Sequence, residues 1–435
     1  ASGYAGLPLD NNDNTNERGK GGVTLISTTD PADSKSVRFK IGARASQSQP
    51  AGTYTNTINF YAVTNPEPEL GPISCPAGKI CYNVNSLTPT EGEMGMQTPT
   101  SSQITNGISL WASNFKKPGY GFAGWNTSYD YSGTNYGPNQ TITAPSDIST
   151  SGLSLYAIWV PSAGDLQNWN GCSSLNQGDV TALKDSRDNN VYAVAKLADD
   201  KCWMIENLRL DNTPELSSTN THNPSLPITN VYDATNPTTS NHLSATTDPT
   251  TTAWCQSGSS ACDDQSMLAT NNTTLFTNNT SSSYSASSNV YSYGNYYNWY
   301  SATAGHGKYG DSYVDGYVAP GDICPAGWHL PTGGSASAEF GALDVAMGGT
   351  GAYQSGDAGK AQSAKWRTYP NNFVYSGIVN GYSINGLGSY SYYWSSSANS
   401  DSAAYNLFFS STGVGPGWGS DAKFVGKLVR CVAGV

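Results

Sequence analysis

Eight cysteines constrain the fold of this 435-residue sequence more than any other feature. None of them forms a Cys-x-x-Cys pair, and the chain has only four histidines, so the spacing of zinc sites is missing. An even number of cysteines without metal spacing indicates disulfides formed in an oxidising compartment, with free buried thiols as the alternative. Sequential pairing is the simplest arrangement and predicts four bonds: Cys75–Cys81, Cys172–Cys202, Cys255–Cys262 and Cys324–Cys431.

The net charge of the chain limits the kinds of partner that it can bind. Lys and Arg number 21 against 32 Asp and Glu, a net charge of -11, which argues against nucleic acid and anionic membranes as partners. Charged residues make up only 12% of the chain, which contains 47 Gly and 28 Tyr residues. This composition is typical of extracellular β-rich proteins. No apolar run approaches the roughly 20 residues of a membrane span, so we expect no membrane insertion. No charged-then-apolar leader begins the sequence, so we expect any secretion signal to have been removed or to lie outside it.

Residues 1–66 are predicted to form an N-terminal β domain. Val37, Phe39 and Ile41 alternate with polar residues, as in a strand with one buried face. The segment is short for a complete sandwich, which needs around seven strands and about 100 residues. We therefore expect either a small sheet or an incomplete, sandwich-like sheet that takes a strand from elsewhere.

A second module is predicted for residues 72–160. Pro118-Gly119 predicts a turn, and the aromatic residues Tyr120, Phe122 and Trp125 after it predict a small core. The pattern Pro-Gly-Tyr-x-Phe-x-Gly-Trp, with the later strand Leu-Tyr-Ala-Ile-Trp at 155–159, resembles the internalin-type B-repeat of bacterial surface proteins. This resemblance implies a β-grasp-like fold that acts as a spacer or contact surface.

A third module is predicted for residues 165–435. Two strands, 191–194 and 202–205, flank a turn at Asp199-Asp200. The ordered set Cys-Trp-Met (202–204), Cys-Pro with Gly-Trp (324–328), Tyr-Trp-Ser-Ser (393–396) and Val-Arg-Cys (429–431) resembles the FISUMP-type domain. This resemblance implies an α+β C-type lectin-like fold. Residues 211–290 depart from the family pattern and are rich in Ser, Thr and Asn, so we interpret them as a polar insertion, stapled in part by Cys255 and Cys262.

Two further segments of this module have local signatures. Residues 335–349 predict a helix with a Ser335 or Ser337 cap, an apolar face of Phe340, Leu343 and Met347, and a stop at Gly348-Gly349. Residues 288–305 are dense in Tyr and Trp. They fit a sugar-stacking surface, but a buried aromatic layer under the sheet is the favoured interpretation.

The sequence contains no recognisable catalytic constellation. It lacks a Gly-x-Ser-x-Gly elbow, an HExxH motif and a P-loop, and His329 is expected to form a local hydrogen bond rather than act as a base. Asp10, Asn12 and Asn14 begin like a calcium loop but lack its glycine and closing glutamate. The sugar-selecting strings of calcium-dependent lectins are absent from the third module. We therefore expect no enzyme activity, no cofactor and no metal.

The strongest candidate for a binding surface is residues 378–428. In the strand 405–410, Tyr405, Leu407 and Phe409 are predicted to point into the core, and Asn406, Phe408 and Ser410 outward. An outward Phe408 is a typical binding anchor, and Trp418 and Phe424 stand in a glycine-rich loop that cannot bury them. Tyr, Trp, Ser, Gly and Asn also dominate antibody paratopes. The predicted ligand-binding residues are Tyr382, Tyr390, Tyr392, Asn399, Asp401, Asn406, Phe408, Trp418, Asp421 and Phe424.

The lectin-like resemblance carries a further implication for this segment. In some similar proteins the C-terminal stretch is diversified by adenine-directed retroelement mutagenesis, which converts Asn codons to a limited set of residues. The Asn, Phe, Ser, Gly, Asp, Ala and Val residues between 406 and 428 fit that set, whereas Trp418 needs another starting codon. A fixed binding surface and an ordinary loop with partly buried aromatics are the alternatives.

Together these features predict a mainly β, multidomain, extracellular protein of a bacterial cell surface. Its predicted function is that of a non-enzymatic adhesin or receptor whose lectin-like face binds a protein or glycan ligand. The first alternative is a structural subunit of an extracellular filament or pilus, self-assembled through the incomplete N-terminal sheet. The second alternative is a carbohydrate-active enzyme with two carboxylates.

Overall fold

A computed structural model describes residues 72–88, 90–92, 94–210, 216–223, 244–245, 268–270, 293–304, 306, 317–380, 383–400, 402–423 and 425–434. The chain divides into two compact units, residues 1–67 and 68–435, and every described residue belongs to the second. The predicted N-terminal β domain therefore lies outside the described residues. So do most of the predicted insertion and both Cys255 and Cys262.

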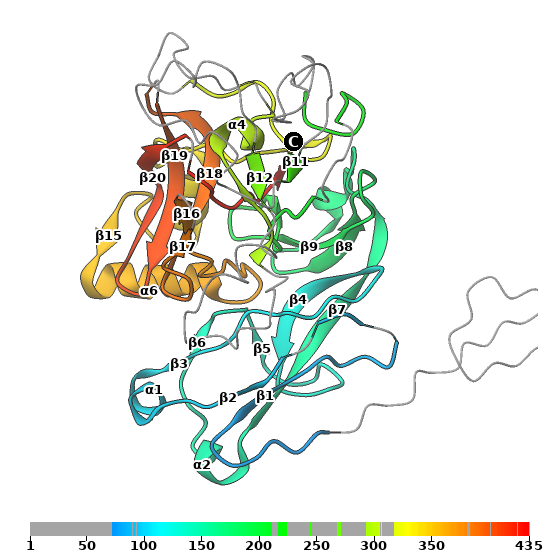
Figure 1. Ribbon diagram of the computed structural model, residues 1–435, viewed down its shortest axis with the longest axis vertical. Helices are drawn as coiled ribbons and strands as arrows, with labels where there is room; N and C mark the ends of the chain where they lie inside the picture. The colour runs from blue at the N-terminus through cyan, green and yellow to red at the C-terminus, as the bar shows by residue number, and fades with distance from the viewer. Residues whose placement is uncertain are drawn as a thin grey trace, which may run out of the picture. The chain divides into compact units, whose positions relative to one another are not determined.

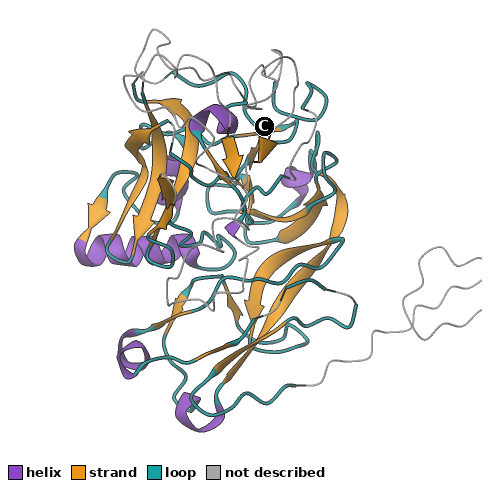
Figure 2. Cartoon of the chain, viewed as in Figure 1, coloured by secondary structure: helices purple, strands orange, loops and turns teal. Residues whose placement is uncertain are grey.

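The described part of the chain is mainly β, as predicted, with short helices between the strands (Figure 2). Its strands up to residue 204 are β1 (Ile80–Asn83), β2 (Met96–Gln97), β3 (Ile108–Ser109), β4 (Tyr120–Asn126), β5 (Asn135–Tyr136), β6 (Thr141–Ile142), β7 (Leu153–Asp165), β8 (Val180–Lys184), β9 (Val191–Lys196) and β10 (Cys202–Met204). The later strands are β11 (Ser244–Ala245), β12 (Leu268–Thr270), β13 (Tyr296–Tyr297), β14 (Trp328–His329), β15 (Gln354–Ser355), β16 (Ile378–Asn380), β17 (Ser383–Asn385), β18 (Tyr390–Ala398), β19 (Ala403–Ser410), β20 (Gly413–Ala422) and β21 (Val432–Ala433). The helices are α1 (Ser101–Asn106), α2 (Ile148–Ser151), α4 (Trp299–Ala302), α5 (Glu339–Ala346) and α6 (Gly356–Arg367), with a 3-10 turn η1 (Gly171–Ser174).

The long strand β7 crosses the predicted boundary between the second and third modules. Its first part pairs in parallel with β1 and antiparallel with β4, and its last part pairs in parallel with β8. One sheet therefore continues through both predicted modules, in the order β14-β21-β10-β9-β8-β7-β1-β2, with β4 paired to β7 and β5 paired to β4. Figure 1 labels β9, β8, β7 and β1 of this sheet.

A buried carboxylate adds a second link at this junction. Glu206 Oε2 accepts the backbone N–H of Phe122 in β4 at 3.1 Å and that of Ala193 in β9 at 2.7 Å. Its other oxygen lies 3.2 Å from the Arg209 guanidinium. Burial raises the pKa of Glu206, and the charge of Arg209 opposes part of that rise. Gly121 permits the close approach of β4 and β9, because a Cβ there would lie 2.5 Å from the Ala193 nitrogen.

Aromatic side chains fill a small core below this junction. Phe122 and Trp125 are buried with their ring centroids 5.0 Å apart, and Tyr120 packs at the edge. The sequence prediction of an aromatic core after the Pro118-Gly119 turn is therefore confirmed. Gly119 has φ 81, the left-handed region that such a turn requires.

The strands predicted around Asp199-Asp200 are present as β9 and β10, and Asp200 occupies the turn with φ 62. The aromatic segment before residue 305 is a buried layer, as favoured above, and not an exposed stacking surface in its described part. Its buried members are Tyr293, Tyr296, Tyr297, Trp299 and Tyr300.

The helix predicted for residues 335–349 forms as α5 but begins later and carries buried charge. The N-cap is Ala338, and both Ser335 and Ser337 precede it, so the predicted serine cap is wrong. Thr332 Oγ1 instead accepts the N–H of Glu339, the first helical residue. Phe340 and Leu343 are buried as predicted, and Met347 is half-buried.

Asp344 corrects the expectation of an entirely apolar inner face on α5. This carboxylate is fully buried. It accepts hydrogen bonds from the Gln362 amide at 2.9 Å and the Trp366 indole at 3.2 Å, both on α6. Helix α6 therefore supplies the polar partners that burial of the carboxylate requires.

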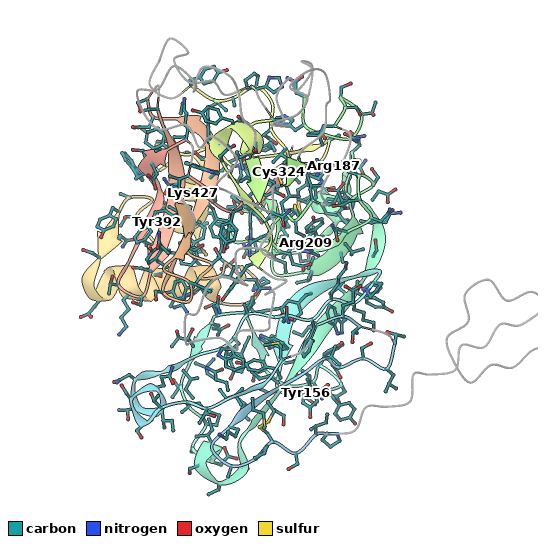
Figure 3. The ribbon with its side chains drawn as sticks, in the orientation of Figure 1. Tyr156, Arg187, Arg209, Cys324, Tyr392 and Lys427 are labelled. Carbon is teal, nitrogen blue, oxygen red and sulfur yellow. A yellow bond between two sulfur atoms is a disulfide. The ribbon has the colours of Figure 1, made fainter. Side chains whose placement is uncertain are left out.

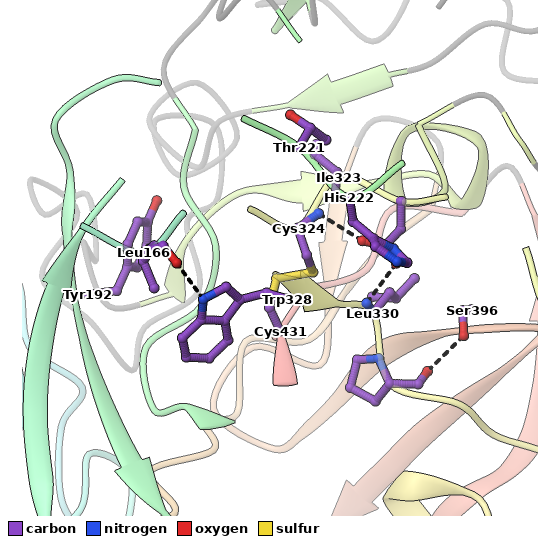
Figure 4. The surroundings of a disulfide bond; sticks show 12 residues. Leu166, Tyr192, Thr221, His222, Ile323, Cys324, Trp328, Leu330, Ser396 and Cys431 are labelled. Carbon is purple, nitrogen blue, oxygen red and sulfur yellow. Dashed lines mark hydrogen bonds and ion pairs between the residues drawn. A yellow bond between two sulfur atoms is a disulfide. The ribbon is translucent and has the colours of Figure 1, made fainter. Parts of the chain in front are cut away.

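Three of the four predicted disulfides are confirmed: Cys75–Cys81, Cys172–Cys202 and Cys324–Cys431. The last joins cysteines 107 residues apart and lies beside the buried Trp328, whose indole donates to the Leu166 carbonyl at 2.8 Å (Figure 4). Among the described residues, no helix is long and apolar enough to cross a membrane.

The disulfides should differ in their contribution to stability because they close loops of different length. We expect Cys324→Ala with Cys431→Ala to lower the free energy of unfolding by about 4–5 kcal/mol. Removal of Cys75–Cys81, whose cysteines are only 6 residues apart, should cost about 2 kcal/mol. Urea unfolding of the two double variants measures both values, and equal losses would contradict the loop-length explanation.

Candidate functional site

The candidate site lies on the four-stranded sheet of β15, β20, β19 and β18, in this order. Helix α6 packs on one face, where Leu407 and Phe409 are buried with Trp366 (Figure 1). On the other face the pairing registers arrange residues in rows across the strands. One row runs from Tyr392 through Phe408 to Gly415.

Four aromatic side chains lie on or beside this row, and we call them the aromatic strip: Tyr353, Phe408, Tyr390 and Tyr392. The Tyr392 and Phe408 ring centroids are 4.8 Å apart, and the Tyr390 centroid lies 5.8 Å from that of Tyr392. Tyr390, Tyr392 and Phe408 are half-buried, whereas Tyr353 is 63% exposed. The strip therefore presents ring surface to solvent.

Gly415 separates Tyr353 from Phe408 within the strip. A Cβ on Gly415 would lie 3.5 Å from Tyr353 Cδ2, which is ordinary contact. It would point to the side of the sheet that carries Phe408, because the two residues are register partners. Gly415 itself is buried, so backbone and not a side chain lies between the two rings.

The position of Tyr390 depends on another glycine. A Cβ on Gly386 would lie 1.9 Å from the Tyr390 ring, and Gly386 has φ 74, a conformation that other residues rarely adopt. Any larger residue at 386 would displace this ring. The turn before β18 therefore sets the edge of the strip.

A buried lysine lies at the inner end of the strip (Figure 3). The Lys427 side chain is fully buried, and its Nζ lies 4.6 Å from the Tyr392 ring centroid and 4.2 Å from that of Trp394. Its charged partner is Asp421 at 3.2 Å. Burial lowers the pKa of Lys427 to about 7, although Asp421 opposes the change. Burial, together with the negative charge of Asp421, raises the pKa of Tyr392 to about 12.

Asn406 corrects a sequence prediction. It points to the face opposite Leu407 and Phe409, as expected, but it is only 1% exposed. The simple rule of one buried and one exposed face fails here because Trp394, its register partner, and the neighbouring Lys427 cover this face too. Tyr405, predicted to lie in the core, is half-buried, whereas Leu407 and Phe409 are buried as predicted.

Trp418 is exposed as expected, but it lies on β20 and not in a loop. It is 46% exposed, and its indole donates to the Gly351 carbonyl, in the loop that leads to Tyr353. Asn399 is half-buried in the turn between β18 and β19. The predicted residues Tyr382, Asp401 and Phe424 lie outside the described residues.

The structure therefore brings Tyr390, Tyr392, Asn406, Phe408 and Asp421 together on one face of the sheet. Sequence reasoning missed two further members of this surface: Tyr353 and Lys427. Tyr353 stands between glycine-rich segments, a context that cannot bury a ring, and this signal was available in the sequence. Lys427 gave no such signal, because its burial depends on the pairing of three separate strands.

A second polar cluster surrounds the Cys324–Cys431 disulfide. Asp322 accepts hydrogen bonds from His222 Nδ1 at 2.8 Å and from the backbone N–H groups of Cys324 and Leu330 (Figure 4). The hydrogen bond to Asp322 raises the pKa of His222. The Asp322 carboxylate is therefore held in place by hydrogen bonds within the fold.

The Glu339 carboxylate, at the start of α5, is likewise held by hydrogen bonds within the fold. It accepts hydrogen bonds from His329 Nε2 at 2.7 Å, Lys201 Nζ at 2.8 Å and the Thr332 N–H at 2.9 Å. Burial alone would raise its pKa, but His329 and the other donors lower the pKa to about 2. In the part of the chain that the structure describes, no group of three His, Cys, Asp or Glu side chains is arranged to hold a metal ion.

A cleft lies away from the aromatic strip, between residues 116–120 and 188–191. Its side chains pair with one another: Lys116 Nζ lies 3.9 Å from the Glu91 carboxylate, and Lys117 Nζ lies 4.0 Å from the Tyr120 ring centroid. None of the predicted ligand-binding residues lines it.

Comparison of the chain with protein-family models, with curated proteins and with solved structures finds no match. The resemblances to the B-repeat and to the FISUMP-type domain therefore stay predictions.

The lowered pKa of Glu339 predicts acid sensitivity. A carboxylate whose pKa falls from 4.5 to about 2 on folding stabilises the fold above pH 4.5, and this contribution is lost as the pH falls towards 2. We expect wild-type protein to lose more unfolding free energy than Glu339→Gln between about pH 5 and pH 2. Glu91→Gln, which removes only an exposed pair, should follow the wild type; parallel losses in all three proteins would exclude this role of Glu339.

Proposed function

We propose that the chain is a non-enzymatic, extracellular protein of a bacterial surface that binds a protein or glycan partner through the aromatic strip. The observation that carries this proposal is a row of partly exposed rings on a rigid sheet. Such rings offer a large contact area with few rotatable bonds, so little conformational entropy is lost on binding.

The packing beneath the strip supports this role. The opposite face of the sheet is anchored to α6 through Leu407, Phe409 and Trp366, so the strip rests on a closed core. Within the strip, contacts between Tyr390, Tyr392 and Phe408 hold the rings before any partner arrives. Preorganisation of this kind increases affinity.

The compartment is supported by the disulfides. Three bonds with ordinary geometry are compatible with a secreted protein, because cytosolic thiols are kept reduced. The alternative role as a filament subunit depends on residues 1–66, which lie outside the described residues. Among the described residues, the carboxylates of Asp322 and Glu339 are held by local donors, which does not support a role as the two carboxylates of a carbohydrate-active enzyme.

Binding should depend on the rings themselves. We expect Tyr392→Ala and Phe408→Ala each to weaken binding at least tenfold, about 1.4 kcal/mol, if they are anchors. The full chain and both variants are applied to a glycan array and to an array of extracellular proteins. Ile104→Ala removes an exposed apolar side chain elsewhere and should retain every signal. A wild-type signal that both strip variants keep would overturn the proposal.

Gly415 provides a test that adds atoms instead of removing them. Its backbone does not require glycine, and a Cβ there meets only Tyr353 at 3.5 Å. Gly415→Val should therefore fold with unchanged circular dichroism, while its branched side chain lies between Tyr353 and Phe408 and alters the spacing of these rings. We expect loss of the array signal with an unchanged thermal midpoint; full binding by this variant would show that the partner does not use this part of the strip.

A further inference from the structure

The Lys427 side chain extends from a segment beside β18, at one edge of the four-stranded sheet, across the sheet to β20. Its own segment lies beside β18, where the Leu428 N–H donates to the Tyr392 carbonyl and the Leu428 carbonyl accepts the Trp394 N–H. The ammonium reaches across the rings of Tyr392 and Trp394 to Asp421 on β20. Since β19 lies between β18 and β20, Nζ lies over β19.

Asn406 is the polar residue of β19 on this side. Its register partners are Trp394 on β18 and Gly419 on β20, so the side chain is on the same face as the lysine and lies between the two strands that Lys427 bridges. Gly419 has no side chain to crowd the amide: a Cβ there would lie 3.4 Å from Asn406 Oδ1. The amide and the amine therefore lie on the same face of the sheet, and both are buried there.

Both groups are buried without hydrogen-bond partners. Neither Asn406 Oδ1 nor Asn406 Nδ2 has a partner among the described residues, and Lys427 Nζ has only its ion pair with Asp421. A buried unpaired amide and a buried amine each cost free energy that a purely structural role does not explain. Ordinary packing would place apolar side chains here.

The three groups form a set with a specific chemistry: an amine nucleophile, an amide electrophile and a carboxylate that moves protons. Burial lowers the pKa of Lys427 to about 7, so a large fraction of the amine is neutral and nucleophilic near neutral pH. The Tyr392 and Trp394 rings exclude water from the amine, which limits competing hydrolysis.

We propose that Lys427 and Asn406 form an intramolecular isopeptide bond, with Asp421 as the proton carrier. The lone pair of neutral Nζ attacks Asn406 Cγ, and the carbonyl electrons move to Oδ1. Asp421 takes a proton from Nζ and delivers it to Nδ2. The Cγ–Nδ2 bond then breaks as the carbonyl re-forms, so one ammonia leaves and the new amide keeps one hydrogen on Nζ. No oxidant or cofactor is needed.

This bond would tie β19 to the segment after β20, beneath the aromatic strip, and it does not depend on the proposed binding function. Intact mass spectrometry of the full chain, after reduction of its disulfides, is the direct test. We expect the protein to be lighter than its sequence mass by one ammonia, and digestion to yield a branched peptide that joins residue 406 to residue 427. A full sequence mass would overturn the proposal.

Variants distinguish this reaction from other reactions that lower the mass of the protein. Lys427→Arg and Asn406→Ala should each restore the full mass, and Asp421→Asn should delay the loss of ammonia. Lys423→Arg is the matched control, because Lys423 is also buried and lies 4.5 Å from a ring centroid, that of Trp299, but stands outside the trio; it should keep the loss. An ammonia loss mapped to a succinimide at an Asn-Gly sequence, or a water loss joining Lys427 to Asp421, would contradict the proposed bond.

Discussion

The backbone hydrogen bonds of β7 hold the described unit together. Thirteen residues of one strand pair with β1 and β4 in the first part and with β8 in the second. Glu206 reinforces this join, because one buried oxygen accepts N–H groups from β4 and β9. Separating the two halves would break the strand pairing and leave a buried carboxylate without its donors, which is the costly outcome for a polar group.

The candidate binding surface depends on this closed scaffold through the core below it. Tyr393, Leu407 and Phe409 bury one face of the small sheet against α6, so the opposite face can present rings without collapsing. Glycine determines the shape of that face. Gly386 leaves room for the Tyr390 ring, and Gly415 places no side chain between Tyr353 and Phe408. The surface is thus formed as much by missing side chains as by present ones.

Local chemistry could be predicted from the sequence, and long-range arrangement largely could not. The Asp199-Asp200 turn and the aromatic core at Phe122 and Trp125 are properties of short segments and were confirmed, as were three of the four predicted disulfides. The start of α5 was misplaced because Thr332, seven residues before Glu339, supplies the partner expected from a serine.

The prediction of the candidate site failed in the same way wherever the burial of a residue depended on distant strands. Alternation in β19 gave the direction of Asn406 correctly, but its burial comes from Trp394 and Lys427, which belong to other segments. Tyr353 joins Phe408 only through the pairing of β15 with β20. Hydrophobic patterns along one strand carry no information about what covers its second face.

The parallel pairing of β1 with β7 has a mechanical consequence when the chain is stretched. Tension that enters from the N-terminal side pulls β1 from its amino end, while β8 grips β7 near its carboxyl end. Strands pulled in this way slide past each other in shear, so their hydrogen bonds must rupture together and not one by one. The Cys75–Cys81 bond passes the force directly to the middle of β1 and leaves the residues between the two cysteines slack. The geometry is that of a clamp that resists stretching.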